Sequence, residues 1–401
     1  MDKNNKFQTG NVLTLSIAHL FHDIYTSFLA PILPLLIEKL GISLTMAGLL
    51  DVIRKAPSML NPFVGLLADK MCVRYFVILS PGITAITMSL LGIVPNYLTL
   101  AILLFVAGIS TTLFHVPAPV MTRKVSGKMV GRGMSFLMLG GELARTLGPL
   151  LITAAVSWWG LEKSYRVMPL GIVASIVLYF RLRNIRISDD FQKKKKEFGA
   201  RETFMKLLPF FTILAGFTIF RSMIKLALTL YLPTYLTMKG QSLWLAGISL
   251  SILQFSGAGG AFIAGPLSDK IGRKKTLIIA SIAMPILMFL FLISNNVFMI
   301  PLLVLLGIFT ISTTPVVLAL VQETDTEHPA FVNGIYMTIG FGVSSLMVLL
   351  IGFLSDKIGM EKTFMICTFA STGAIPFILM LKEKHNTIAS VKKITPKKEI
   401  E

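Results

Sequence analysis

The chain has 401 residues, of which 54% are hydrophobic and only 14% charged, and its formal net charge at pH 7 is +18. Soluble globular proteins carry about 25% charged residues, so this composition excludes an ordinary soluble enzyme and predicts a polytopic membrane protein. The two cysteines, Cys72 and Cys367, are too few for a disulfide framework or a multi-thiolate metal site. No Gly-x-x-x-x-Gly-Lys-Ser/Thr loop is present, so the sequence contains no ATP-binding motif of the P-loop type.

Apolar stretches long enough to cross a bilayer follow one another along the chain. The first half contains six, at 11–38, 44–68, 73–94, 97–120, 130–158 and 163–182. The second half contains six more, at 204–237, 242–268, 274–294, 297–321, 331–355 and 361–382. The sequence therefore predicts an all-α fold of twelve transmembrane helices in two pseudo-symmetric six-helix bundles. We expect four segments: an N-terminal bundle (1–182), a basic cytoplasmic linker (183–203), a C-terminal bundle (204–382) and a cytoplasmic tail (383–401).

Lys and Arg are concentrated on one side of this arrangement. The linker carries four consecutive lysines, Lys193 to Lys196, whereas the opposite loops hold only Lys39, Lys163, Arg166, Lys239, Lys357 and Lys362. The positive-inside rule then predicts that both termini lie in the cytoplasm. We expect the protein to be a multi-pass protein of the cell (inner) membrane. The excess positive charge reflects topology and attraction to anionic lipids of the cytoplasmic leaflet, so we expect no nucleic-acid partner.

A loop motif occurs in both halves at a separation of 200 residues. It comprises Gly65, Asp69, Lys70 and Arg74 in the first half, and Gly265, Asp269, Lys270, Gly272 and Arg273 in the second. A weaker third copy runs from Gly352 through Asp356 and Lys357 to Gly359. We interpret the motif as a conformational latch, because glycine permits close helix approach and the carboxylate can cap a helix and attract the following cation. The alternative is a tight turn with solvated charges. Acidic residues after 297–321, Glu323 among them, are candidates to dock on the second copy.

This pattern resembles the major facilitator superfamily, whose loop motif reads Gly-x-x-x-Asp-Arg/Lys-x-Gly-Arg-Arg/Lys. Within it, the first half is similar to the fosmidomycin-resistance efflux group. The residues that carry this similarity are Ser16 to Asp23 with His19 and His22, Phe114-His115-x-Pro117, Gly140-Gly141, and Leu147-Gly148-Pro149. The resemblance implies an efflux transporter that works by alternating access. Gly148-Pro149 is also similar to the antiporter motif of proton-coupled exporters, which implies proton exchange.

Eight charged side chains fall inside the predicted spans, where an ionised group is costly unless it is paired or faces water. They are Asp23, Asp51, Arg54, Lys55, Glu142, Arg145, Arg221 and Lys225. We assign proton coupling to Asp23 and Glu142, with His19 four residues before Asp23 as its partner. The alternative for Asp23 is a purely structural role, and the alternative for Glu142 is that of a counter-ion for Arg54 or Lys55.

The remaining membrane charges are more basic than acidic, and an electropositive cavity favours anionic solutes. We therefore predict a substrate site formed by Arg54, Lys55, Arg145, Arg221, Lys225, His115, His22, Tyr25, Asp51, Gln254 and Asn333. Arg221 and Lys225 either reach an acid across the bundle or face an anion. For Lys225, snorkelling to the surface is the alternative.

Together these features predict a secondary active transporter that exports an anionic or amphiphilic small molecule, drug-like or phosphonate-like, by proton antiport. The alternatives are a proton-coupled importer of an organic anion and, less favoured, a membrane enzyme. No Ser-His-Asp set is recognisable, so we predict no enzymatic activity. We also predict no cofactor and no bound metal, because His19 and His22 provide at most one pair of neighbouring ligands. A transported metal is a third, weaker alternative, which the excess of cations disfavours.

Overall fold

The computed structural model describes residues 7–61, 74–183, 200–294, 296–324 and 329–381, and all regular structure in these ranges is helical. Eleven helical segments among them are long and apolar enough to span a membrane. The predicted span 44–68 is described only in part, as helix α3 (Leu44–Lys55) and the short 3-10 helix η2 (Ala56–Leu60). The prediction of an all-α polytopic membrane fold is confirmed.

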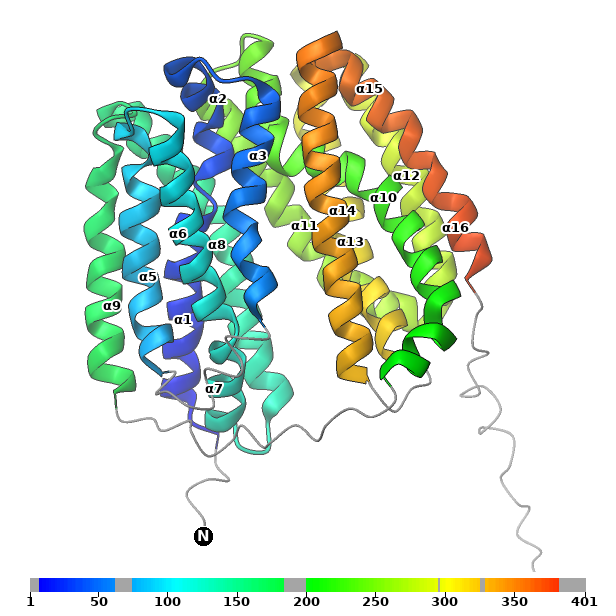
Figure 1. The fold of residues 1–401 in the computed structure, drawn as a ribbon, viewed down its shortest axis with the longest axis horizontal. Helices are drawn as coiled ribbons and strands as arrows, with labels where there is room; N and C mark the ends of the chain where they lie inside the picture. Colours follow the sequence, from blue (N-terminus) through cyan, green and yellow to red (C-terminus); the bar gives the residue numbers. More distant parts are fainter. Residues whose placement is uncertain (1–6, 62–73, 184–199, 295, 325–328, 382–401) are drawn as a thin grey trace, which may run out of the picture.

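The first half of the chain forms one group of helices (Figure 1). Besides α3 and η2 it contains α1 (Thr9–Thr26), α2 (Leu29–Leu40), α5 (Arg74–Ser89), η3 (Leu90–Ile93), α6 (Tyr97–His115), α7 (Pro117–Val125), α8 (Val130–Trp159), η4 (Ser164–Val167) and α9 (Met168–Leu182). We call this group the N bundle.

The second half forms the C bundle. It contains α10 (Ala200–Met238), α11 (Leu243–Ile271), α12 (Arg273–Ile293), α13 (Asn296–Gln322), α14 (Pro329–Ile358), α15 (Met360–Ala370), η5 (Ser371–Gly373) and α16 (Ala374–Met380).

Two predicted spans are divided where the sequence interrupts the helical hydrogen-bond ladder. In 11–38, the hydroxyl groups of Thr26 and Ser27 both donate to the carbonyl of Asp23 at 2.9 Å, and α2 begins only at Leu29. Pro31 has no N–H to continue the ladder from Ser27. In 97–120, α6 ends just before Pro117 for the same reason. These breaks place irregular backbone at membrane depth, which is tolerated where it is buried in protein or lines a cavity.

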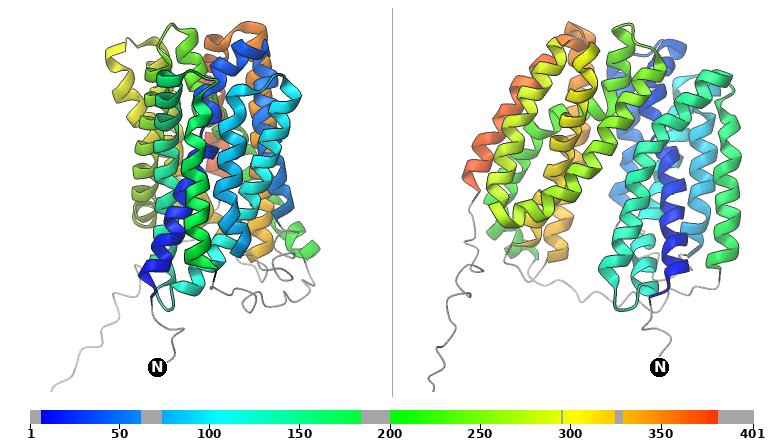
Figure 2. Two further views of the ribbon diagram at one scale, coloured as in Figure 1. Left: turned by 90° about the vertical axis from the view of Figure 1, so that its left-hand side faces the viewer. Right: turned by 180° about the vertical axis from the view of Figure 1, so that it is seen from behind.

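The two bundles pack through three main helix pairs: α8 against α11, α3 against α14, and α2 against α10. Figures 1 and 2 show that the helices of the two bundles lie close at the upper end and diverge toward the lower end, where α1 begins. Glycine makes the close approach possible: a Cβ added to Gly352 of α14 would meet the backbone of Leu44 in α3.

Among the described residues, the hydrogen bonds between the two bundles all lie at this upper end, which we call the closed end. The carboxylate of Asp356 accepts from the amides of Leu44 and Thr45, at 2.8 and 2.9 Å, and from the Thr45 hydroxyl at 2.6 Å. The hydroxyl of Tyr231 in α10 shares its single proton between the carbonyl of Leu44, at 3.2 Å, and that of Val348 in α14, at 3.1 Å. Asp356 therefore caps the first turn of α3, and the third copy of the loop motif joins the two bundles.

Candidate functional site

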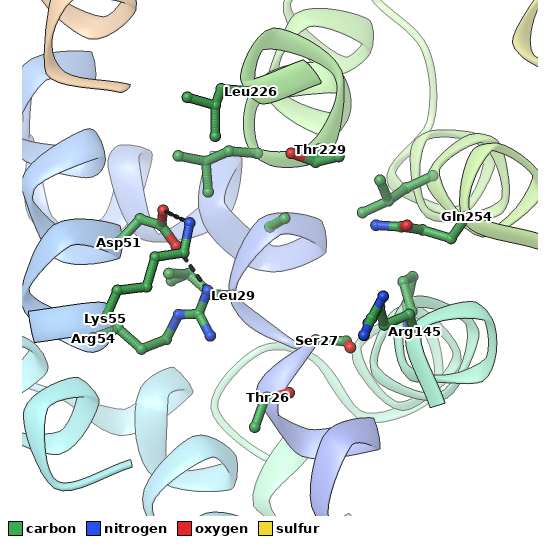
Figure 3. Close-up of a pocket in the computed structure, with 14 residues that line it drawn as sticks. Thr26, Ser27, Leu29, Asp51, Arg54, Lys55, Arg145, Leu226, Thr229 and Gln254 are labelled. Atoms are coloured by element: carbon green, nitrogen blue, oxygen red, sulfur yellow. Dashed lines mark hydrogen bonds and ion pairs between the residues drawn. The ribbon is translucent and has the colours of Figure 1, made fainter. Parts of the chain in front are cut away.

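A cavity of about 210 Å³ lies between the bundles (Figure 3). It is lined by the α1–α2 break, α3 and α8 from the N bundle and by α10 and α11 from the C bundle. Its polar and charged lining residues are Thr26, Ser27, Asp51, Arg54, Lys55, Arg145, Thr229 and Gln254. Pockets for drug-sized ligands usually measure about 300–1,000 Å³, so this cavity suits a small solute or one polar end of a larger molecule.

One carboxylate in the cavity holds two cations. Asp51 is 3% exposed, and its two oxygens accept from Nη2 of Arg54 at 2.7 Å and from Nζ of Lys55 at 2.5 Å. Figure 3 shows this cluster on one side of the cavity and Arg145 on the other. The lining thus contains three cations and one carboxylate, which gives it an excess of two positive charges.

Glu142 pairs with a residue of its own helix. Its Oε1 lies 2.9 Å from Nη1 of Arg145, three residues later in α8, rather than near Arg54 or Lys55. The Arg145 side chain is 41% exposed and that of Glu142 is 24% exposed. Because the guanidinium reaches the cavity and keeps further donors, the pair leaves Arg145 able to bind a second anion.

Arg221 and Lys225 lie on α10 without an acidic partner at ion-pair distance in the part of the chain that the structure describes. Arg221 is 8% exposed, and its Nη2 donates to the hydroxyl of Thr314 in α13 at 2.6 Å. The charged groups near Lys225 are Arg221, Lys55, Arg145 and Glu142, so cations from both bundles converge on this region. Two alternatives were predicted for Arg221 and Lys225, an acid across the bundle or a bound anion, and the described residues do not provide the acid.

Three predicted site residues, all histidines, gather around Asp23 inside the N bundle. Nε2 of His19 and Nε2 of His115 each lie 3.2 Å from an oxygen of Asp23, and Nε2 of His22 lies 3.9 Å away. His22 also stacks on the ring of Phe114 at a centroid distance of 4.5 Å. The sequence placed His19 beside Asp23 by helical spacing, whereas His115 arrives from α6 through tertiary packing.

Six residues of the predicted substrate set are not among the residues that line the cavity: Arg221, Lys225, His22 and His115, described above, and Tyr25 and Asn333. Tyr25 is fully buried, and its hydroxyl donates to the carbonyl of Val167 at 2.7 Å and accepts from the amide of Gly171 at 2.9 Å. This residue therefore ties α1 to α9 within the N bundle and does not face the cavity. Asn333 lies in the first turns of α14, contacts Met337 and is not among the cavity residues. The sequence indicates only that both side chains are polar, and polarity alone does not reveal the direction of a side chain.

The cavity also contains residues that sequence reasoning missed. Thr26, Ser27 and Thr229 contribute hydroxyl groups to its lining. Small hydroxyl residues are common in membrane helices, so their type gives no signal, but the proline-rich break after Thr26 marked this stretch as irregular.

The second copy of the loop motif forms an ion-pair network. Arg273 bridges Asp269 at 2.5 Å and Glu323, the residue after α13, at 2.9 Å, and it also donates to Ser268. Gly272 adopts a φ of +99° between α11 and α12, where a side chain would be strained. Lys270 is exposed.

Of the first copy, Gly65, Asp69 and Lys70 lie outside the described residues. Arg74 begins α5 and places its guanidinium 5.1 Å from the ring centre of Tyr75.

Comparison with known proteins agrees with this architecture. The Major Facilitator Superfamily profile matches residues 15–348. The chain belongs to the Major Facilitator Superfamily. It is 23% identical over 384 residues to the fosmidomycin resistance protein of Escherichia coli (strain K12), with 94% of each chain covered. It is 25% identical over 270 residues to the multi-drug resistance efflux pump PmrA of Streptococcus pneumoniae, which covers 63% of this chain and 66% of that protein.

Among solved structures, a bacterial homologue of the human lysosomal transporter Spinster, in an inward-facing and occupied conformation, superposes with a TM-score of 0.75 at 15% identity. The alignment covers 93% of this chain and 96% of that one. The predicted resemblance to the superfamily and to its fosmidomycin-resistance group is thereby confirmed. This major facilitator protein is a multi-pass membrane transporter and not an enzyme.

Proposed function

We propose that this transporter exports an anionic or amphiphilic small molecule, phosphonate-like in its charged group, in exchange for protons. The observation that carries the proposal is the excess of cations over carboxylates in the cavity between the bundles. A phosphonate or carboxylate accepts bidentate hydrogen bonds from arginine, and Arg54 and Arg145 face each other across that cavity (Figure 3). The similarity to the fosmidomycin resistance protein supports the same chemistry, because fosmidomycin is a phosphonate.

The paired charges support the proposed coupling to protons. When Glu142 takes up a proton, Arg145 loses its intrahelical partner at 2.9 Å and gains affinity for an anion. Asp23, surrounded by three imidazoles, is the second carboxylate that we assign to proton exchange, with His19 as its partner. We place both termini in the cytoplasm on the basis of the Lys and Arg distribution. The closed end then faces outward and the cavity is reached from inside, as an exporter requires for loading.

Binding of the anion is tested with the purified protein and fosmidomycin as the probe. We expect Arg145→Gln to weaken binding about 10- to 100-fold, the equivalent of one charge-assisted hydrogen bond of about 1.5–3 kcal/mol. The matched control is Arg132→Gln, which removes an exposed arginine of the same helix that packs over Phe7. Equal affinity of the Arg145 variant and the control for fosmidomycin would refute the proposal that Arg145 binds the anion.

Coupling and direction are tested in proteoliposomes with an imposed pH gradient. We expect the gradient to drive probe movement opposite to the protons, and Glu142→Gln to abolish this dependence while downhill exchange persists. Flux that follows the proton direction would identify an importer of an organic anion. Flux that ignores the gradient in the unmodified protein would exclude protons from the mechanism.

A further inference from the structure

A cluster of three imidazoles and one carboxylate lies inside the N bundle, apart from the lining of the cavity. It consists of His19, His22 and Asp23 on α1 and His115 at the end of α6, and we call it the imidazole cluster. One ligand atom each of His19, Asp23 and His115 lie within 4.8 Å of one another. His19, His22 and Asp23 are buried, whereas the side chain of His115 is 39% exposed. The cluster is therefore enclosed on one side and open at His115.

The hydrogen-bond network assigns the tautomer of His19. Its Nδ1 lies 2.7 Å from the backbone carbonyl of Leu137, which can only accept, so Nδ1 carries the proton. The Nε2 of this ring lies 3.2 Å from Oδ2 of Asp23, at ion-pair distance. In the protonated ring Nε2 donates to that carboxylate, and in the neutral ring its unshared electron pair is available to a metal ion.

A chain of hydroxyl groups assigns the tautomer of His22 in the same way. Ser110 donates its hydroxyl proton to the carbonyl of Ser80 at 3.0 Å and must therefore accept from Thr84 at 2.8 Å. Thr84 has then used its only proton, so at 3.2 Å it accepts from Nδ1 of His22. Nε2 of His22, which is fully buried and has no hydrogen-bond partner among the described groups, is left with its electron pair toward Asp23.

We infer that the imidazole cluster is a binding site for a divalent transition-metal ion of the Zn²⁺ type, with His19, Asp23 and His115 as ligands and His22 beside the open position. Metal-bound imidazoles characteristically donate their other nitrogen to a carbonyl or a hydrogen-bonded partner, as both buried histidines do here. In a tetrahedral site with bonds of about 2.0–2.1 Å, neighbouring ligand atoms lie about 3.3 Å apart. Each of the two imidazole nitrogens lies 3.2 Å from a different oxygen of Asp23, and one ligand atom from each of the three residues lies within 4.8 Å of the others, so an ion would have to draw the ligands closer together.

Nitrogen ligands distinguish this site from one for Mg²⁺ or Ca²⁺, which take oxygen ligands. Three protein ligands and an open fourth position are typical of sites where the metal exchanges or carries a further ligand. The spacing of the sequence predicted at most one pair of imidazoles, because His115 is 92 residues from Asp23 along the chain. The inference shares Asp23 with the proposed proton step but needs no transport, so it stands if the proposed function fails.

The test is a titration of the full-length protein, purified without a polyhistidine tag and freed of metal by a chelator. We expect Co²⁺ to bind at one ion per chain with the visible ligand-field absorption of a tetrahedral site, Zn²⁺ to displace it, and Mg²⁺ to leave it in place. Removal of one ligand by His115→Gln should raise the dissociation constant for Co²⁺ at least tenfold. His385→Gln removes a histidine of the predicted cytoplasmic tail and should leave it unchanged.

A second variant keeps all three ligands and tests whether His22 is a further one. Thr84→Val removes the acceptor for Nδ1 of His22, which lies beside the open position, so it should weaken Co²⁺ binding less than His115→Gln does, and an equal or greater loss would contradict the proposed set of ligands. Absence of Co²⁺ binding by the unmodified protein would overturn the proposal. So would equal loss of binding in the His115 and His385 variants.

Discussion

Asp356 provides the sharpest test of how the closed end is held together. Its carboxylate accepts three hydrogen bonds from the first turn of α3: Oδ1 from the amide of Leu44, and Oδ2 from the amide and hydroxyl of Thr45. In Asp356→Asn only one side-chain oxygen remains. The amide nitrogen that replaces the other oxygen is a donor, and it faces the backbone N–H of Leu44 or Thr45, which is also a donor. At least one bond across the bundles is lost in either orientation of the amide.

The magnitude follows from these losses. A lost hydrogen bond costs about 0.5–1.5 kcal/mol, and a carboxylate at a helix N-terminus contributes about 0.3–1 kcal/mol. Asp356 is exposed, so water screens its charge, and we take about 1 kcal/mol for the total. These bonds exist only while the closed end is closed. The substitution should therefore increase the ratio of open to closed conformations about fivefold.

The assay is the distribution of distances between two spin labels at this end. Cysteines introduced at Lys163 and Lys362, both exposed, place one label on each bundle, after Cys72 and Cys367 have been replaced. We expect Asp356→Asn to increase the population at long distance.

The matched control is Glu361→Gln. Glu361 also bears a carboxylate at this end, but it binds Lys239 of its own bundle at 2.5 Å and raises the pKa of that ammonium group. The control should leave the distances unchanged. A distribution in Asp356→Asn indistinguishable from that of the unmodified protein would refute the role of Asp356 as a cap between bundles.

Three further substitutions test other parts of the structure. Tyr25→Phe leaves two buried backbone groups without their hydrogen-bond partner, so it should lower the free energy of unfolding by about 1–3 kcal/mol and lower the melting temperature in detergent. Affinity for the anionic probe should stay constant. A fall in affinity at unchanged stability would show that Tyr25 belongs to the substrate site. Gly260→Leu should destabilise the C bundle, because any Cβ there meets the backbone of α13, and a melting temperature equal to the parent would show that the helices can separate at no cost. Arg273→Gln removes both ion pairs of the second loop motif. Because Glu323 is half-exposed, we expect the free energy of unfolding to fall by only about 0–1 kcal/mol. A fall of more than about 3 kcal/mol would indicate that the network is effectively buried.

The sequence by itself determined the fold class and the overall positions of the helices, because a bilayer imposes length and apolarity on every span. It also identified the cations that line the cavity, since a charge inside an apolar span is conspicuous and must be explained. Pairs three or four residues apart, such as Glu142 with Arg145, were within its reach because one helix fixes their geometry. Even so, sequence reasoning left open whether Glu142 would pair within its helix or across the bundle.

Contacts between distant segments were decided only by the tertiary structure. Three examples are the approach of His115 to Asp23, the capping of α3 by Asp356, and the burial of Tyr25 against α9. In each case the partner lies more than 90 residues away, and its position depends on how entire helices pack and rotate. Residue type and local spacing contain no information about that rotation, so a polar side chain that looks available in the sequence can be fully satisfied inside a bundle.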